Sequence, residues 1–175
     1  MDLRTMRTIK SIKEAFLHIR RKKPLEKITV KEIAELAIIN KSTFYRYYED
    51  IYALSNEIEN DIISECVSAH PGLDELTGKD GVKKLTAAIT EQTKAFSVVF
   101  SGSRLDVAVN KLHDALMAKI LKEHPELKND IEKRVIITAV IYGNFKSYLI
   151  YQNEDKTKVM DGVSKLSELL REYVV

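Results

Sequence analysis

The amino-acid sequence predicts an all-α protein. Apolar residues recur at steps of three and four through most of the chain, and no segment alternates apolar and polar residues over enough positions to indicate a sheet. With only 6 Gly and 3 Pro in 175 residues, the chain has few places to turn, and Pro24, Pro71 and Pro125 stand where the predicted helices end. At this length, with 45% hydrophobic residues, the chain can bury the core of one domain or of two small ones.

The first predicted helix is followed by two short helices around a tight turn. Thr29 is expected to cap the second helix, with Glu32 reaching back to the backbone N–H of Thr29 in a capping box. Asn40 is expected to cap a third helix that runs to about Tyr48. The first helix braces this pair through an inner face formed by Ile9, Ile12, Phe16 and Ile19.

The third helix has a composition suited to reading DNA. Phe44 and Tyr48 are four residues apart and are expected to face the core, which leaves hydroxyls, an amide and cations outside. A helix of about eight residues is about 12 Å long, and the major groove of B-DNA is about 12 Å wide. We therefore predict a helix-turn-helix in which Thr29 and Lys31 contact the DNA backbone. The contacts of the reading helix are assigned to Asn40, Lys41, Ser42, Thr43, Tyr45, Arg46 and Tyr47.

This segment resembles the DNA-reading part of the tetracycline-repressor (TetR) family of bacterial transcription regulators. The resemblance covers about the first 55 residues, and its matching positions are Ala37, Ile39, Thr43, Phe44, Tyr45, Tyr47 and Tyr48. Two positions depart from the family pattern. Ile38 stands where a turn glycine is usual, so a turn that needs positive φ would strain it, and Ile51 stands where a phosphate-contacting lysine is common.

The resemblance implies a DNA-binding head over residues 1–50 and a helical effector-binding and dimerisation domain over residues 51–175. It also implies a repressor that binds a palindromic double-stranded DNA operator as a homodimer and is released by a small-molecule effector. Some relatives bind DNA without such an effector and answer to a protein partner, and this alternative stays open.

The distribution of charge agrees with this interpretation. Residues 1–50 hold 12 Lys and Arg against 7 Asp and Glu, a net +5, while residues 51–175 hold 16 against 19, a net −3. Only the amino-terminal part therefore suits a polyanion. The run Arg20-Arg21-Lys22-Lys23 can be a phosphate contact or simply a solvated helix end. Arg4, Arg7 and Lys10 are better placed for phosphates by the resemblance.

The rest of the chain also has helical periodicity. One helix is expected from about Tyr52 to Ala69, another from about Val82 to Phe96, and another from about Leu105 to Ile120. Their inner positions are Leu54, Ile58, Ile62 and Cys66, then Val82, Leu85, Ile89 and Phe96, then Leu105, Val109, Leu112, Leu116 and Ile120.

The last two predicted helices indicate a dimer. The segment 134–151 is apolar on more than one face, which one core cannot cover, and Gly143 would allow two backbones to approach closely. A seam follows at Val159, Val163, Leu166, Leu170 and Tyr173, so a four-helix bundle between two copies is expected.

The family resemblance also implies an effector pocket in the middle of the chain. Its candidate residues are Phe96, Phe100, His113, Met117, Tyr142 and Phe145, although each of them also fits ordinary core packing. His113 in particular can be a ligand contact or a histidine satisfied at the rim of the core.

No enzyme or cofactor is expected. Cys66 and His70 lie four apart, but a metal site wants three or four protein ligands and no third is evident. Glu57 and Asp61 are expected to form a solvated face, and no phosphate loop or nucleophile elbow occurs. A single cysteine, the absence of a signal-type apolar stretch and the absence of any run of about 18 apolar residues favour a cytoplasmic protein without a membrane partner.

Overall fold

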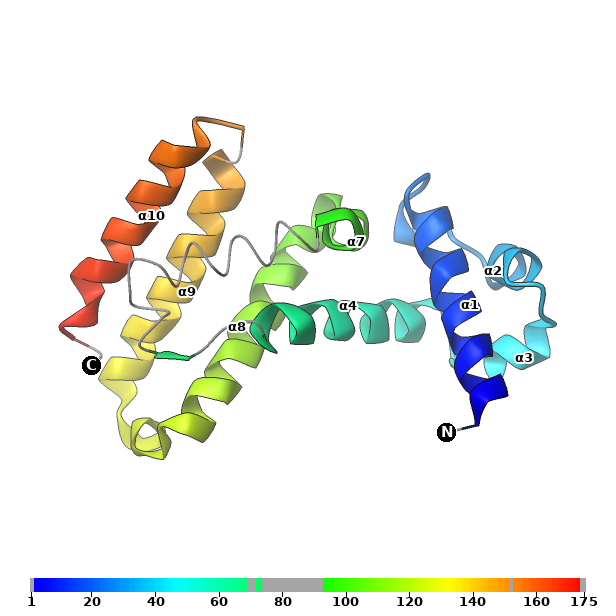
Figure 1. The fold of residues 1–175 in the computed structure, drawn as a ribbon, viewed down its shortest axis with the longest axis horizontal. Coiled ribbons are helices and arrows are strands. Elements are labelled where there is room, and N and C mark those ends of the chain that lie inside the picture. Colours follow the sequence, from blue (N-terminus) through cyan, green and yellow to red (C-terminus); the bar gives the residue numbers. More distant parts are fainter. Residues whose placement is uncertain (1, 69–71, 74–92, 152, 174–175) are drawn as a thin grey trace. The chain divides into compact units, whose positions relative to one another are not determined.

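The computed structural model describes residues 2–68, 72–73, 93–151 and 153–173. Within these ranges every regular element is a helix, which confirms the all-α prediction (Figure 1). The α-helices are α1 (Leu3–Arg20), α2 (Val30–Leu36), α3 (Lys41–Tyr45), α4 (Ile51–Ser68), α7 (Thr93–Val99), α8 (Leu105–Glu123), α9 (Ile131–Tyr151) and α10 (Lys156–Arg171). Short 3-10 turns lie at Leu25–Lys27, Gly102–Arg104 and Pro125–Asn129.

The chain divides into two compact units. The first contains residues 1–62 together with 94–102, and the second contains the described residues of 63–93 together with 103–175. Helix α4 begins in the first unit and ends in the second, and α7 belongs to the first unit almost entirely.

The first unit is built around the inner face of α1. Ile12, Phe16 and Ile19 are buried there and Ile9 is half-buried, as their spacing predicts. Helix α2 packs on α1, and α3 packs on α2 (Figure 1). The other buried side chains of this core are Leu25, Ile28, Ile33, Ala34, Phe44, Tyr48, Leu54, Ile58 and Ile62. The three amino-terminal helices thus share one apolar core.

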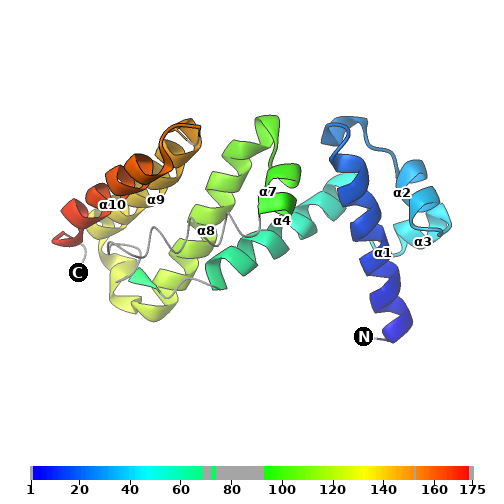
Figure 2. The same cartoon turned by 45° about the horizontal axis from the view of Figure 1, so that its top comes forward.

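The second unit consists mainly of α8, α9 and α10. Helix α8 buries Val109, Leu112, Leu116 and Ile120, while Leu105 is half-buried at its start. Helices α9 and α10 lie side by side in both views (Figure 1, Figure 2). Met160 and Val163 of α10 form a small cluster against Tyr148 of α9.

A close approach and a polar contact fix α9 against α10. A Cβ at Gly143 would lie 3.4 Å from Leu166 Cδ2, so this glycine serves packing within the chain. Asn144 Nδ2 donates a hydrogen bond of 2.6 Å to Ser167 Oγ, and both residues are buried. A buried polar pair of this kind favours one register of two helices over its neighbours.

Several predicted features lie outside the described residues. They include His70 and Pro71 as well as Val82, Leu85 and Ile89 of the predicted helix ending near Phe96. Leu170 lies in α10, but its side chain is outside the described part as well. Among the described helices, none is both long enough and apolar enough to cross a bilayer. In the same ranges, no three His, Cys, Asp or Glu side chains are grouped so that they could hold a metal ion.

Candidate nucleic-acid interface

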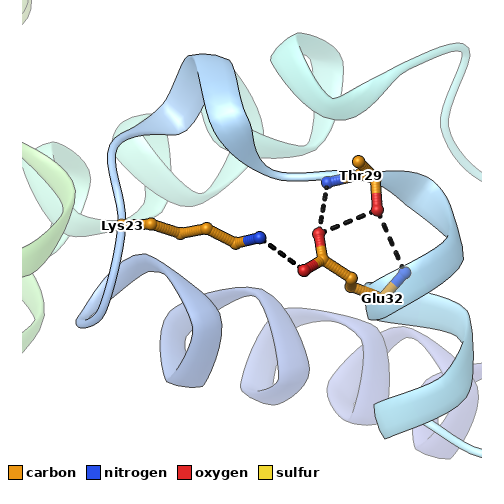
Figure 3. A network of polar contacts seen from close by, with 3 residues as sticks. All are labelled: Lys23, Thr29 and Glu32. Atoms are coloured by element: carbon orange, nitrogen blue, oxygen red, sulfur yellow. Dashed lines mark hydrogen bonds and ion pairs between the residues drawn. The ribbon is translucent and has the colours of Figure 1, made fainter.

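The start of α2 is fixed by the predicted capping box. Thr29 Oγ1 accepts a hydrogen bond of 3.3 Å from Glu32 N, and Glu32 Oε2 accepts one of 3.0 Å from Thr29 N (Figure 3). The Thr29 hydroxyl also donates to Glu32 Oε2 at 2.8 Å. Two otherwise unpaired backbone N–H groups are satisfied in this way. Since the hydroxyl proton of Thr29 is directed at Glu32, the predicted phosphate contact of Thr29 has to use another atom or a rearranged hydroxyl.

Lys23 completes this network from the loop after α1. Its ammonium pairs with Glu32 Oε1 (Figure 3). The hydrogen bonds from Lys23 and Thr29 favour the ionised carboxylate and lower the pKa of Glu32 to about 2. One cation of the basic run therefore anchors α2 rather than meeting phosphate.

The other cations of the run have different surroundings. Arg20 is buried, and its guanidinium donates to the carbonyl oxygens of Val99 and Ser101, each at 3.4 Å, and of Lys23 at 3.3 Å. Both interpretations of the run, phosphate contact and solvated helix end, are therefore wrong for Arg20, which joins the end of α1 to the end of α7. Of the four residues of this run, only Arg21 and Lys22 are exposed.

The turn between α2 and α3 contains a strained residue. Ile38 has φ of 56° and is the one non-glycine residue with positive φ in the described part of the chain. The N–H of Ile39 donates to the carbonyl of Ala34 at 2.9 Å, and the N–H of Ile38 donates to that of Glu35 at 3.3 Å. These bonds form a Schellman motif, which requires a left-handed residue after the helix and usually has glycine there. The expectation of strain at this position is confirmed.

Helix α3 is shorter than predicted. It covers Lys41–Tyr45, 5 residues, and the chain leaves it through a helical turn in which Tyr48 N donates to Phe44 O at 3.0 Å. Asn40 does occupy the N-cap position, but its side chain makes no capping hydrogen bond. The predicted cap is therefore wrong in its chemistry, and the Asn40 amide is left exposed.

The inward face of α3 is as predicted. Phe44 is fully buried and Tyr48 nearly so, with their ring centroids 5.7 Å apart. Tyr45 meets Phe44 edge-on at 5.6 Å, although Tyr45 itself is 56% exposed. The other residues of the segment 40–48 lie toward its outer side. Those exposed are Asn40, Lys41, Ser42, Tyr45 and Arg46, and those half-buried are Thr43 and Tyr47.

A hollow of about 660 Å³ lies on this outer side of the head. Residues of α1, of α2, of the turn and of the segment 40–48 converge on it, and its charged residues are Arg4, Arg46 and Glu35. Its lining residues are Arg4, Thr5, Thr8, Ala34, Glu35, Ile38, Ile39, Asn40, Thr43, Arg46 and Tyr47. Sequence reasoning missed Thr5 and Thr8. Thr8 stands four residues after Arg4 and so shares its helix face, which was a usable signal, whereas Thr5 offered none.

The predicted backbone contacts Thr29 and Lys31 do not line the hollow. Lys31 is exposed and lies 3.9 Å from Glu35, a weak surface pair that a phosphate can displace. Ile51 is the first residue of α4 and is half-buried, so it contributes packing where a lysine would offer charge.

A network of side-chain contacts connects α1 to α4 within the first unit. Lys13 Nζ lies 2.7 Å from Glu57 Oε1 and 2.6 Å from Asp61 Oδ2. Both carboxylates are exposed, as the predicted solvated face requires, and their four-residue spacing also places both of them beside one lysine. Burial lowers the pKa of Lys13, but the hydrogen bonds and charges of Asp61 and Glu57 outweigh it, so the pKa is raised.

Tyr48 extends this network to the residues after α3. Its hydroxyl donates to Glu57 Oε1 at 3.2 Å. Burial and the Glu57 charge raise the pKa of Tyr48 to about 12. The reading segment is thus attached to α4 by a side-chain contact as well as by the chain.

The predicted effector residues are divided between the two units. Phe96 and Phe100 are buried in the first unit with their rings 4.8 Å apart. In the second unit His113 and Tyr142 have ring centroids 5.0 Å apart, and Phe145 is buried while Met117 is half-buried.

Both rings of the His113 and Tyr142 pair have protein partners. His113 Nε2 lies 3.1 Å from Thr138 Oγ1 and its Nδ1 lies 3.0 Å from Asp114 Oδ1. The Tyr142 hydroxyl donates to Asn110 Oδ1 at 2.8 Å. Of the two interpretations of His113, a satisfied rim histidine describes these contacts.

Cys66 is buried, and burial together with the nearby Glu65 charge raises the pKa of its thiol to about 11. Such a thiol is unreactive near neutral pH.

Part of the predicted dimer seam is already covered by packing within the chain itself. Val163 is buried, Val159 and Leu166 are half-buried, and Tyr173 is 61% exposed. Other large apolar side chains of α9 and α10 stay on the surface, namely Ile131, Val135, Ile150, Tyr151 and Leu169.

Comparison with known proteins does not place the chain in a family. No family model, curated protein or solved structure matches it. The basis for inferring a function is therefore the geometry of the head.

Proposed function

We propose that this protein is a DNA-binding transcriptional regulator of the tetracycline-repressor type, which reads duplex DNA through α2, α3 and the turn between them. One observation carries the proposal. Phe44 and Tyr48 are buried, while Lys41, Ser42 and Arg46 around them are exposed. Ser42 and Arg46, four residues apart, share one face of the helical turn. Cations and short polar groups on the exposed side of a braced helix are what base edges and phosphates require.

Charge and shape support the same surface. The net charge of +5 on residues 1–50 falls on the part of the chain that contains the head. Arg4 of α1 and Arg46, directly after α3, line the same hollow. A phosphate of the DNA backbone that approached this hollow would meet two guanidinium groups against one carboxylate, that of Glu35, and this net positive charge favours binding of a polyanion there.

We further propose that the protein binds its operator as a homodimer through α9 and α10. The support is the exposed apolar surface on these helices, where Val135, Leu169 and Tyr173 are each more than half exposed. Covering such side chains with a second copy removes apolar area from water. A two-fold dimer would present two heads to successive major-groove faces about 34 Å apart, and its operator would be palindromic.

Control by a small-molecule effector is part of the proposal, with repression as the default state. Its support is the resemblance of the reading segment to the tetracycline-repressor family, because the polar atoms of His113 and Tyr142 already have partners within the chain. An effector that prefers one conformation of the dimer would change operator affinity by that preference. Control by a protein partner is the competing possibility, and it predicts that no small molecule shifts the affinity for the operator.

Selection from a random duplex pool tests the proposal. The full-length protein should enrich a palindromic sequence, and the enriched duplex should compete against random duplex of equal length. A variant with Lys41→Ala and Arg46→Ala should enrich nothing, whereas Lys122→Ala, which removes an exposed cation from α8, should enrich the same sequence. Failure of the wild-type protein to enrich any duplex would exclude the function.

A further inference from the structure

The side chain of Ile38 has no role in the fold. It is 92% exposed, although its backbone takes the left-handed conformation that glycine adopts without cost. A β-branched residue in this conformation is a backbone outlier. Packing within the head does not offset the strain, because almost none of the side chain is covered. Strain of this kind accumulates where a residue contacts something outside the chain.

The position of Ile38 suggests what it contacts. It lines the hollow together with Arg4, Thr43 and Arg46, and it stands two residues before Asn40, the first residue of the reading segment. Helix α3 has 5 residues and is therefore only about 7.5 Å long. A helix with its side chains is about 10–12 Å across and fills a major groove about 12 Å wide, so the turn in front of so short a helix can lie next to it along the groove.

The hydrocarbon side chain of Ile38 limits which groups of DNA it can contact. A branched hydrocarbon side chain can neither pair with a phosphate nor hydrogen-bond to a base edge. The apolar feature that a base pair offers in the major groove is the C5 methyl group of thymine. We propose that Ile38 is a specificity-determining residue of the head, which selects a thymine in each half-site by contact with its methyl group. This inference rests on the proposed function and adds a preferred base to it.

The test removes the methyl group from the DNA. In the enriched duplex, each thymine is replaced in turn by deoxyuridine, and affinity is measured by fluorescence anisotropy. Wild-type protein should lose about fourfold in affinity at one thymine of each half-site, the factor expected for one buried methyl group. Ile38→Gly and Ile38→Ala should bind the thymine and deoxyuridine duplexes equally at that position. Leu36→Ala, which shortens a half-exposed aliphatic side chain outside the hollow, should keep the fourfold preference.

Two results would overturn the inference while leaving the proposed function intact. One is wild-type binding that is indifferent to deoxyuridine at every thymine. The other is an unchanged thymine preference in both Ile38 variants, which would assign the methyl contact to another residue. Absence of binding to any duplex would instead refute the proposed function together with this inference.

Discussion

Replacing Ile38 by glycine should make the protein more stable. The left-handed conformation costs an L-residue about 1–2 kcal/mol, and Ile38 with φ of 56° bears this cost. Glycine avoids it but raises the entropy of the unfolded chain, which costs about 0.5–1 kcal/mol. Since the side chain is 92% exposed, its loss removes about 0.2 kcal/mol of burial. The net gain is about 0.5 kcal/mol and can reach about 1 kcal/mol.

Ile38→Ala is the matched control, because it removes the same exposed atoms but keeps a Cβ in the left-handed turn. Urea denaturation followed by circular dichroism should rank Ile38→Gly above both Ile38→Ala and the wild type, with the last two close together. A glycine variant that is no more stable than the alanine variant would show that the turn is unstrained and would remove the premise of the Ile38 contact.

Four other predictions follow from the contacts of the head. Phe44→Ala should cost about 3–5 kcal/mol in urea denaturation, since Phe44 is fully buried; a loss below about 1 kcal/mol would contradict its place in the core. With the pKa of Glu32 lowered from 4.5 to about 2, the stability from its ionised form is present above pH 4.5 and lost as pH falls toward 2. A pH series of melting temperatures should show less acid sensitivity in Glu32→Gln, and an identical profile would exclude the linkage. Lys13→Met should lower the free energy of unfolding by about 1 kcal/mol. Lys10→Met, which removes only the exposed pair with Glu14, should lower it by less than about 0.5 kcal/mol. Equal losses of stability in thermal melts would show that the contacts between α1 and α4 add nothing. Arg46→Ala should weaken operator binding by about 1–3 kcal/mol in gel-shift titrations, and unchanged affinity and sequence preference would remove Arg46 from the interface.

Local sequence signals predicted most of the head correctly. The capping box of Thr29 and Glu32 needs only residues three apart, so its pattern in the sequence was sufficient. The burial of Phe44 and Tyr48 also followed from neighbouring positions. The strain at Ile38 followed from the family resemblance, in which a turn glycine is usual there. Helical periodicity placed α4 and α8 within a few residues of their observed ends.

Contacts between distant residues were not predictable in the same way. Lys13 lies 48 residues from Asp61, and Arg20 lies 79 residues from Val99. No local pattern predicts that Arg20 of the basic run is buried, because two of the carbonyls that accept its hydrogen bonds, those of Val99 and Ser101, lie far along the chain. The length of α3 was overestimated for a different reason. The hydrogen bonds of a helical turn continue to Tyr48, although the regular helix ends at Tyr45.

The salt dependence of duplex binding tests the central claim most directly. The affinity of wild-type protein for its enriched duplex should fall steeply between about 50 and 200 mM salt, because binding releases counterions from the DNA and this release is less favourable at higher salt. On a plot of log affinity against log salt concentration, the slope should be about −0.9 per neutralised phosphate. The variant with Lys41→Ala and Arg46→Ala should bind more weakly with a slope shallower by about two contacts, while Lys122→Ala should match the wild type. Equal slopes for all three proteins, or no salt-sensitive binding by the wild type, would contradict the assignment of α3 to DNA.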